Sequence, residues 1–323
     1  MSAERILVVG SNGLLGQKIT EYLIRGSAHK VTVCSIEPAS VLPLHSADYL
    51  QLDITSKKDV KKIVHTVGPG VIINCAAMTN VDACETEREL AWKLNTEGVE
   101  HIIEAARKDN ARIFHISTDY IFDGKAGPYD ELSRPEPLSY YGKTKLASEN
   151  ALLVSGLDCF IARTMVLYGT GLNVKPNFAL WLIENLKKNL PVRIVDDQFG
   201  NATLVDDLAQ GVLSGIELEK HGIYNLAGRD IISRFQFAVQ LAKVFDFDPD
   251  LVVPIKSSQL HQHAPRPMKS GLITLKAEVE LGYRPSTAEQ GLLILKSQLA
   301  RVPKNMPDSA PMPSVSRSGR TKR

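Results

Sequence analysis

The chain has 323 residues, of which 44% are hydrophobic and 23% are charged, and this composition is that of a folded globular protein rather than a disordered or fibrous one. Its length allows two structural lobes, or one large α/β unit with a smaller appended part. The longest apolar run, Phe178–Ile183, is far shorter than the roughly 18 residues that a membrane-spanning helix requires. We therefore expect no membrane partner.

The formal net charge is +2, but the excess lies after Val302, where five basic residues face one acidic residue. The rest of the chain is slightly acidic, so we expect no nucleic-acid partner. The segment 303–323 is rich in proline and serine and has no aromatic residue, which predicts a disordered basic tail.

The four cysteines lie far apart with no C-x-x-C pair, and most of them flank apolar runs. They are typical of reduced core residues, and the chain starts on an apolar strand rather than a signal sequence, so we expect a cytoplasmic protein. His261 and His263 have no further ligand types close to them in sequence, and we expect no metal site.

Apolar, β-branched runs alternate with helix-period stretches in the first half, as in βαβ units of a parallel sheet. The predicted strands are Arg5–Gly10, Lys30–Ser35, Tyr49–Leu52, Val71–Asn74, Arg112–Ser117 and Asp158–Arg163. The helices predicted between them are Leu14–Arg25, Lys57–Thr66, Glu89–Lys108 and Tyr140–Val154. Later helices are predicted at Asn177–Lys188, Asp206–Glu217, Arg234–Val244 and Ala288–Leu299, with a strand at Val192–Val195.

This pattern predicts an α/β fold, a Rossmann-type doubly wound parallel sheet followed by a smaller C-terminal α/β lobe. We place a dinucleotide-binding domain at 1–164 and a mainly substrate-binding lobe at 165–302. The boundary is soft, because an apolar segment at 223–227 could be a strand that returns to the first sheet.

A glycine-rich turn joins the first strand to the first helix. Its residues are Gly10, Ser11, Asn12, Gly13, Leu14, Leu15 and Gly16. Glycines let the backbone approach a pyrophosphate, and the free N–H groups of a helix N-terminus hold its negative charge. The G-x-x-G-x-x-G spacing is one residue longer in its first gap than the commonest fingerprint. The turn predicts a dinucleotide site.

Further cofactor contacts are expected at the carboxyl ends of the next strands. Ser35 stands where an acid often holds the adenosine ribose of NAD, and Glu37 follows two residues later, so the cofactor choice stays open with a lean to NADPH over NADH. Asp53 and Ile54 are expected near the adenine. Small residues against which the cofactor can lie are Cys75, Ala76 and Ala77.

Tyr141 and Lys145 are four residues apart, which places them on one face of a helix. An ammonium beside a phenol lowers the pKa of the phenol, and the same lysine can bind a cofactor ribose. Thr118 follows a predicted strand, at the edge where doubly wound sheets bind ligands, and its hydroxyl can hold a substrate carbonyl oxygen. We interpret the three residues as a catalytic group, with Tyr141 and Lys145 also touching the cofactor.

At this point the sequence resembles the extended short-chain dehydrogenase/reductase family and, more narrowly, its dTDP-4-dehydrorhamnose reductase branch. The resemblance runs to about Val302 and rests on the glycine turn and on the segments Asn74–Ala77, Ser117–Gly124, Tyr141–Lys145, Asp197–Thr203 and Ala264–Pro267. It implies reduction of a nucleotide-linked 4-keto-6-deoxysugar with NADPH or NADH. The reaction most expected is the conversion of dTDP-4-dehydrorhamnose to dTDP-rhamnose. In that reaction Tyr141 would protonate the developing alkoxide that Thr118 holds.

The resemblance also implies substrate contacts at Thr118, Asp119, Tyr120, Val166 and Arg266. Arg266 would pair with the substrate diphosphate, for which a guanidinium is suited. Val166 stands where the family usually has an aromatic residue that packs on the deoxysugar, so the identity of the sugar stays open. Ala202 replaces a proline of the family pattern.

Three other functions compete with reduction. A 4,6-dehydratase of the same family needs an Asp-Glu pair after the threonine, and the presence of Tyr120 after Asp119 disfavours it. An epimerase stays open. A non-catalytic regulatory role, as in a relative that modulates methionine adenosyltransferase, also stays open. The nucleotide-sugar substrate is the expected partner, and a homodimer stays open.

Overall fold

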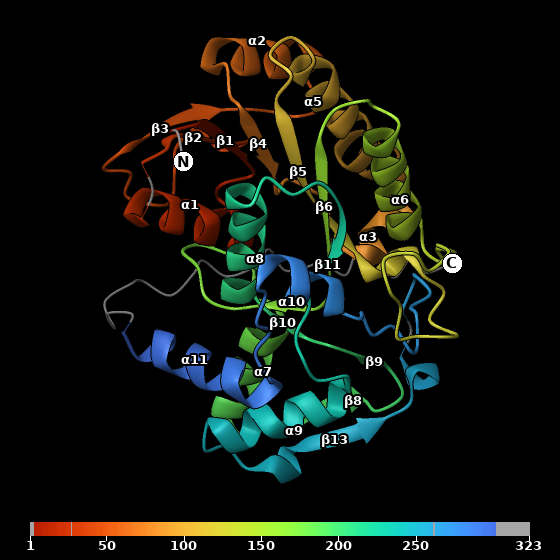
Figure 1. Cartoon of the computed structure of the whole chain (residues 1–323). Coiled ribbons are helices and arrows are strands. Elements are labelled where there is room, and N and C mark those ends of the chain that lie inside the picture. Colours follow the sequence, from red (N-terminus) through yellow and green to blue (C-terminus); the bar gives the residue numbers. More distant parts are fainter. Residues whose placement is uncertain (1–2, 27, 261, 302–323) are drawn as a thin grey trace, which may run out of the picture.

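The computed structural model describes residues 3–26, 28–260 and 262–301 (Figure 1). Its centre is a seven-stranded sheet in which every neighbouring pair is parallel, in the order β11-β6-β5-β4-β1-β2-β3. The strands are β1 (Arg5–Val9), β2 (Lys30–Ser35), β3 (Ala47–Gln51), β4 (Val71–Asn74), β5 (Arg112–Thr118), β6 (Cys159–Thr164) and β11 (Gly222–Asn225). The predicted doubly wound α/β fold is confirmed.

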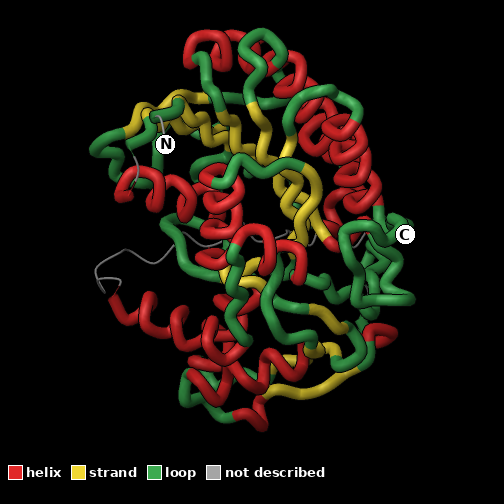
Figure 2. The backbone as a smooth tube through the Cα atoms, viewed as in Figure 1, coloured by secondary structure: helices red, strands yellow, loops and turns green. Residues whose placement is uncertain are grey.

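Helices cover both faces of this sheet, as Figures 1 and 2 show. One face packs on α1 (Leu14–Gly26), α8 (Val205–Glu217) and α10 (Leu275–Leu281), and the other on α2 (Lys57–Val67), α5 (Gly98–Ala106) and α6 (Tyr140–Leu153). Ile6 and Val8 of β1 belong to the first core, whereas Leu7 and Val9 belong to the second. Since side chains of a strand alternate between faces, a buried parallel strand must be apolar throughout, as β1 is.

The C-terminal part has its own core, outside the main sheet. Its elements are α7 (Phe178–Lys187), α9 (Arg234–Val244), α11 (Ala288–Arg301) and the parallel pair β8 (Val192–Val195) and β13 (Val252–Ile255). Two smaller pairs, β7 (Leu167–Tyr168) with β10 (Thr203–Leu204) and β9 (Phe199–Gly200) with β12 (Ile232–Ser233), link it to the sheet. The strand expected at 223–227 is β11, which pairs with β6.

The predicted helix at Glu89–Lys108 is wrong as a single element. It is broken into α4 (Arg88–Trp92), a π-helical turn at Lys93–Glu97, and α5. In the wide turn, Asn95 donates to the Thr144 hydroxyl of α6 at 3.0 Å and accepts from Met78 N at 2.8 Å. These buried hydrogen bonds compensate for the less regular backbone.

Some predictions fall on residues outside the described part of the chain. The basic tail at 303–323 and His261 lie there. Among the described helices, none is long and apolar enough to cross a membrane.

Candidate active site

The glycine turn folds tightly against the end of β4. Gly10 has φ +79°, and a Cβ atom at this position would meet Ala76 N at 2.7 Å. A Cβ at Gly16 would meet the carbonyl oxygen of Gly10 at 2.2 Å. The turn therefore requires glycine at both positions, and it opens α1 with Leu14, while Leu15 is buried in the core.

The residues of this turn fit a dinucleotide. The Ser11 hydroxyl is buried and has no hydrogen-bond partner, although buried polar atoms are nearly always satisfied. The N–H groups of Gly10 and Ser11 both donate to Cys34 O, at 2.8 and 3.0 Å, which ties the turn to β2. An unsatisfied hydroxyl at the start of a helix, beside glycines that leave room, suits a phosphate oxygen.

On the β2 side, Asn12 and Glu37 close the loop where an adenosine ribose would lie. The Asn12 amide donates to Glu37 Oε2 at 3.0 Å and to Ala39 O at 3.0 Å. Burial raises the pKa of Glu37, but hydrogen bonds from Ser35 and Asn12 outweigh it, so the pKa is lowered and the carboxylate is charged. Ser35 thus helps to lower the pKa of Glu37, and both residues lie beside the glycine turn.

The other predicted cofactor residues divide into two groups. Cys75 and Ala76 border the glycine turn directly, since Cys75 N donates to Val9 O and Ala76 approaches Gly10, and Ala77 follows them. Asp53 and Ile54 have structural roles: Asp53 Oδ1 accepts from Thr55 N at 2.9 Å, and Ile54 is in the core against Gly98. We keep their contact with adenine only as a prediction.

Thr118 ends β5, and Tyr141 lies in the first turn of α6, whose N-cap is Ser139. Burial raises the pKa of Tyr141 well above its usual value, although a hydrogen bond from Thr118 opposes this shift, so the lowered pKa expected from the neighbouring lysine is wrong. The phenol is therefore protonated at neutral pH and can donate a proton. Its ring stands edge-on to Tyr120, with centroids 5.6 Å apart.

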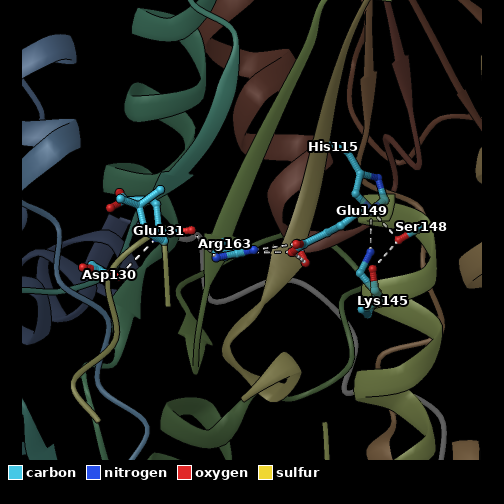
Figure 3. Close-up of polar contacts among 9 residues, drawn as sticks. His115, Asp130, Glu131, Lys145, Ser148, Glu149 and Arg163 are labelled. Carbon is cyan, nitrogen blue, oxygen red and sulfur yellow. Dashed lines mark hydrogen bonds and ion pairs between the residues drawn. The ribbon is translucent and has the colours of Figure 1, made fainter. Parts of the chain in front are cut away.

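Lys145 is fully buried and faces His115 (Figure 3). Its Nζ lies 2.8 Å from His115 Nε2, and the hydroxyl of Ser148, one turn further along α6, lies 3.1 Å from the same nitrogen. Burial lowers the pKa of Lys145 to about 8, while the negative charge of Glu149 opposes this shift. Thr118 thus ends β5, whereas Tyr141 and Lys145 lie one turn apart on α6, with Lys145 against the middle of β5, and the catalytic role of the three residues stays a prediction.

A buried ion pair lies beside the lysine (Figure 3). Arg163 of β6 donates to both carboxylate oxygens of Glu149, at 3.1 and 2.7 Å, and Ser117 donates to the same carboxylate. Arg163 also donates to Glu131 O at 3.2 Å. The Glu149 carboxylate thus accepts three hydrogen bonds, two from Arg163 and one from Ser117, in a fully buried position.

A pocket opens beyond Thr118, between the end of β5 and the C-terminal part. Its lining includes Asp119, Tyr120 and Val166, all three predicted from the sequence, and also Gln198, Phe199 and Arg234. Burial raises the pKa of Asp119 to about 6, although Ser270 donates to its Oδ2 at 2.7 Å. Val166 has φ +46°, a conformation that β-branched residues rarely adopt.

Arg266 does not face the pocket as a free cation. It makes a two-pronged ion pair with Asp82 of α3 (Val81–Thr86), at 2.8 and 2.6 Å. This hydrogen bond from Arg266 lowers the pKa of Asp82 to about 2. A diphosphate would have to compete with, or add to, this pair.

Four residues of this region, His115, Ser148, Glu149 and Arg234, were not predicted from the sequence. The first two are a histidine within an apolar strand and a serine within a helix, and neither position marks the residue as part of a site. Glu149 follows Lys145 by four residues, and this spacing could have placed it on the lysine's face of α6.

Known proteins similar to this chain match nearly its whole length. The family model described as "RmlD substrate binding domain" matches residues 4–299. A dTDP-4-dehydrorhamnose reductase of Aggregatibacter actinomycetemcomitans is 33% identical over 302 residues, which cover 89% of this chain and 97% of that protein.

Two solved structures show the same similarity. A dTDP-4-dehydrorhamnose reductase from Clostridium acetobutylicum has a TM-score of 0.83 and 33% identity, covering 92% of this chain and 99% of the other. The enzyme of that name from Bacillus anthracis, in complex with NADP, has a TM-score of 0.80 and 29% identity, covering 92% and 100%. The chain belongs to the RmlD family of reductases, within the extended short-chain dehydrogenase/reductases.

Proposed function

We propose that this protein is an NAD(P)H-dependent oxidoreductase that reduces a nucleotide-linked 4-keto-6-deoxysugar, dTDP-4-dehydrorhamnose, to the corresponding alcohol. NADPH is the expected cofactor and NADH the alternative. The observation that supports the proposal is that Thr118 ends β5, that Tyr141 and Lys145 lie on α6, and that the glycine turn holds an unsatisfied Ser11 hydroxyl. The reductases that resemble the chain over most of its length support the substrate class.

The cofactor, when bound, supplies the hydride. The protein residues handle the proton and the oxygen. Tyr141 is protonated because burial raises its pKa, so it donates a proton to the alkoxide that develops at the carbonyl carbon. Thr118 holds that oxygen, and the ammonium of Lys145 stabilises the phenolate that remains on Tyr141.

In the same proposal the two halves divide the work. Residues 1–164, with β11, bind the cofactor, and 165–302 supply most of the sugar pocket. Arg266 contacts the diphosphate from its place beside Asp82. The four cysteines carry no disulfide, which supports a reducing, cytoplasmic location.

The test is oxidation of NADPH, followed by the absorbance of the reduced nicotinamide, with dTDP-4-dehydrorhamnose as substrate. We expect Tyr141→Phe to lower kcat by about 10²–10⁴-fold, because it removes the proton donor. Tyr140→Phe is the matched control: the neighbouring ring packs against Arg88, at 5.1 Å, and phenylalanine keeps that contact.

Turnover in the wild type and in Tyr140→Phe, but not in Tyr141→Phe, is the expected result. A wild-type protein that binds NADPH and never oxidises it with this substrate would contradict the proposal. An enzyme that interconverts sugar epimers with no net use of NADPH would point to the epimerase alternative.

A further inference from the structure

The pocket beyond Thr118 has two charged residues in its lining, Asp119 and Arg234, and they form no direct ion pair with each other. Asp119 is buried and uses both carboxylate oxygens elsewhere: Oδ1 accepts from the Thr118 hydroxyl at 3.1 Å, and Oδ2 accepts from the Ser270 hydroxyl at 2.7 Å. The Arg234 side chain makes no hydrogen bond or ion pair within the described part of the chain. The pocket thus contains a cation without a counter-charge from the protein.

The backbone of Arg234 is held firmly at the start of α9. Its N–H donates to Gln198 O at 3.1 Å, and Ser233, just before it, is the N-cap of the helix and closes a capping box with Gln236. The N-terminal end of a helix carries a partial positive charge, which adds to that of the guanidinium. The cation is therefore presented to the pocket from a regular element.

The side chain of Arg234 is oriented by an aromatic contact. Its Cζ lies 5.3 Å from the ring centroid of Phe178, the first residue of α7, and this ring packs on Phe237 with centroids 5.9 Å apart. A cation–π contact leaves the N–H groups at the edge of a guanidinium free to donate. Arg234 is thus held in place while its hydrogen-bond donors stay available.

The other arginine near this pocket, Arg266, precedes the lining residue Pro267 and already has a partner. Its two terminal nitrogens donate to the two carboxylate oxygens of Asp82, at 2.8 and 2.6 Å, and one of them also donates to Ala264 O at 2.7 Å. An anion that met Arg266 would share it with Asp82. Arg234 is therefore the arginine that is free to bind an anion.

The charge of Arg234 is held in an environment that disfavours it. Burial lowers the pKa of Arg234, and the positive charge of Arg266 lowers it as well, although Tyr120 and Asp119 oppose this shift. The guanidinium stays charged nonetheless, because arginine is not deprotonated in proteins. A half-buried cation of this kind is stabilised by an anion that enters beside it.

Such an anion belongs to the substrate rather than to the cofactor. The phosphates of the cofactor are expected at the glycine turn, and Gly10, Gly13 and Gly16 do not line this pocket. Thr118 directly precedes Asp119, so a ligand of the pocket reaches the proposed site of reduction. A nucleotide-linked sugar can carry its charge on the diphosphate or on a carboxylate of the sugar, and both groups present paired oxygens to a guanidinium.

We propose that Arg234 is a substrate-binding residue whose guanidinium pairs with an oxyanion of the substrate, either a phosphate of the diphosphate or a carboxylate of the sugar. The inference rests on the proposed function, because it takes this pocket as the substrate pocket. It adds an unpaired cation to Arg266, the arginine that the resemblance implies.

Calorimetric binding to the full chain saturated with NADPH tests the proposal with four probes: thymidine, dTDP, dTDP-glucose and dTDP-glucuronic acid. Arg234→Met removes the cation and keeps an apolar side chain that can pack on Phe178. Arg193→Met is the matched control, because Arg193 is an exposed residue of β8 that does not line the pocket.

If the anion is the diphosphate, Arg234→Met should bind dTDP about 10–100-fold more weakly than the wild type and bind thymidine equally well. If the anion is a carboxylate, the wild type should prefer dTDP-glucuronic acid to dTDP-glucose by about tenfold, and Arg234→Met should lose this preference. Affinities that are unchanged for all probes, or that fall equally for all of them, would overturn the proposal. A wild type that binds none of the four probes would overturn it as well.

Thermal denaturation separates this role from a structural one. Because Arg234 has no counter-charge in the protein, Arg234→Met should leave the melting temperature without ligand unchanged or raise it. Arg163→Met breaks a buried ion pair and should lower it strongly. A comparable fall in Arg234→Met, together with unchanged affinity for every probe, would show that Arg234 only supports the fold.

If Arg234→Met fails to fold, Arg234→Lys decides the question. Lysine keeps the charge and loses the two-pronged geometry, so this variant should bind the anionic probe about tenfold more weakly. Equal affinity in Arg234→Lys and the wild type would contradict the proposal.

These measurements need no turnover. A wild-type protein that binds NADPH and the probes but never oxidises NADPH would refute the proposed function and leave this test intact.

Discussion

The deep end of the candidate site and its mouth are built on different principles. Behind β5 the charged residues Lys145, Glu149 and Arg163 are buried, come from β6 and α6, and are each hydrogen-bonded. At the mouth, Val166 of a loop, Phe199 of β9 and Arg234 at the start of α9 come from segments far apart in the sequence. The buried charges thus lie on long regular elements of the main sheet layer, whereas the pocket is lined from a loop, a two-residue strand and the first residue of α9.

The buried ion pair of Arg163 and Glu149 should contribute more to the free energy of unfolding than a surface ion pair does. Arg163→Met leaves the Glu149 carboxylate buried without its cation, so we expect the free energy of unfolding to fall by about 3–5 kcal/mol, measured by urea denaturation. Lys188→Met is the control, because its partner Glu184 and the lysine itself are more than half exposed, and such a pair contributes about 0–1 kcal/mol. Equal losses in the two variants would show that the buried ion pair contributes no more to stability than the surface ion pair.

The glycine turn allows a second test, in which the affinity for NADPH is measured. Gly16→Ala places a methyl group against the carbonyl of Gly10, so the turn must shift, and we expect NADPH to bind at least about tenfold more weakly, by about 1.4 kcal/mol. Gly26→Ala is the control, since a Cβ at this end of the same helix meets nothing within 4 Å. Unchanged NADPH affinity in Gly16→Ala would mean that the turn does not hold the phosphates.

In the pocket, a substitution at Val166 should raise the stability of the fold rather than lower it. Its left-handed backbone strains a β-branched residue, and asparagine tolerates this conformation, so Val166→Asn should stabilise the fold by about 1 kcal/mol in thermal denaturation. The same exchange at the exposed Val154, whose φ is −91°, should change stability little. A loss of stability in Val166→Asn would show that its packing in the pocket outweighs the strain.

Much of the cofactor half could be predicted from the sequence, because its signals are local. An apolar strand, a glycine turn and an amphipathic helix follow one another without interruption from Arg5, and Tyr141 and Lys145 share a helix face by spacing alone. The position of Thr118 followed from the end of a strand. In each case a few consecutive residues specify both the element and the position of its side chains.

The remainder depends on pairings that no short segment encodes. His115 meets Lys145 only because β5 and α6 pack at one particular offset, and the π-turn at Lys93–Glu97 forms to satisfy Asn95 against α6. Arg266 meets Asp82, which lies 184 residues earlier. Two-residue strands such as β7 and β10 lack a period that could be detected.

In the proposed reaction a hydride is delivered to the sugar carbonyl while Tyr141 supplies the proton. Mass spectrometry of the product formed with NADPH carrying deuterium at the transferable position tests it most directly. We predict one deuterium at carbon 4 of the product sugar for each NADPH oxidised, and no labelled product from Tyr141→Phe on the same time scale. Labelled product formed equally fast by Tyr141→Phe, or oxidation of NADPH without deuterium in the sugar, would contradict the account.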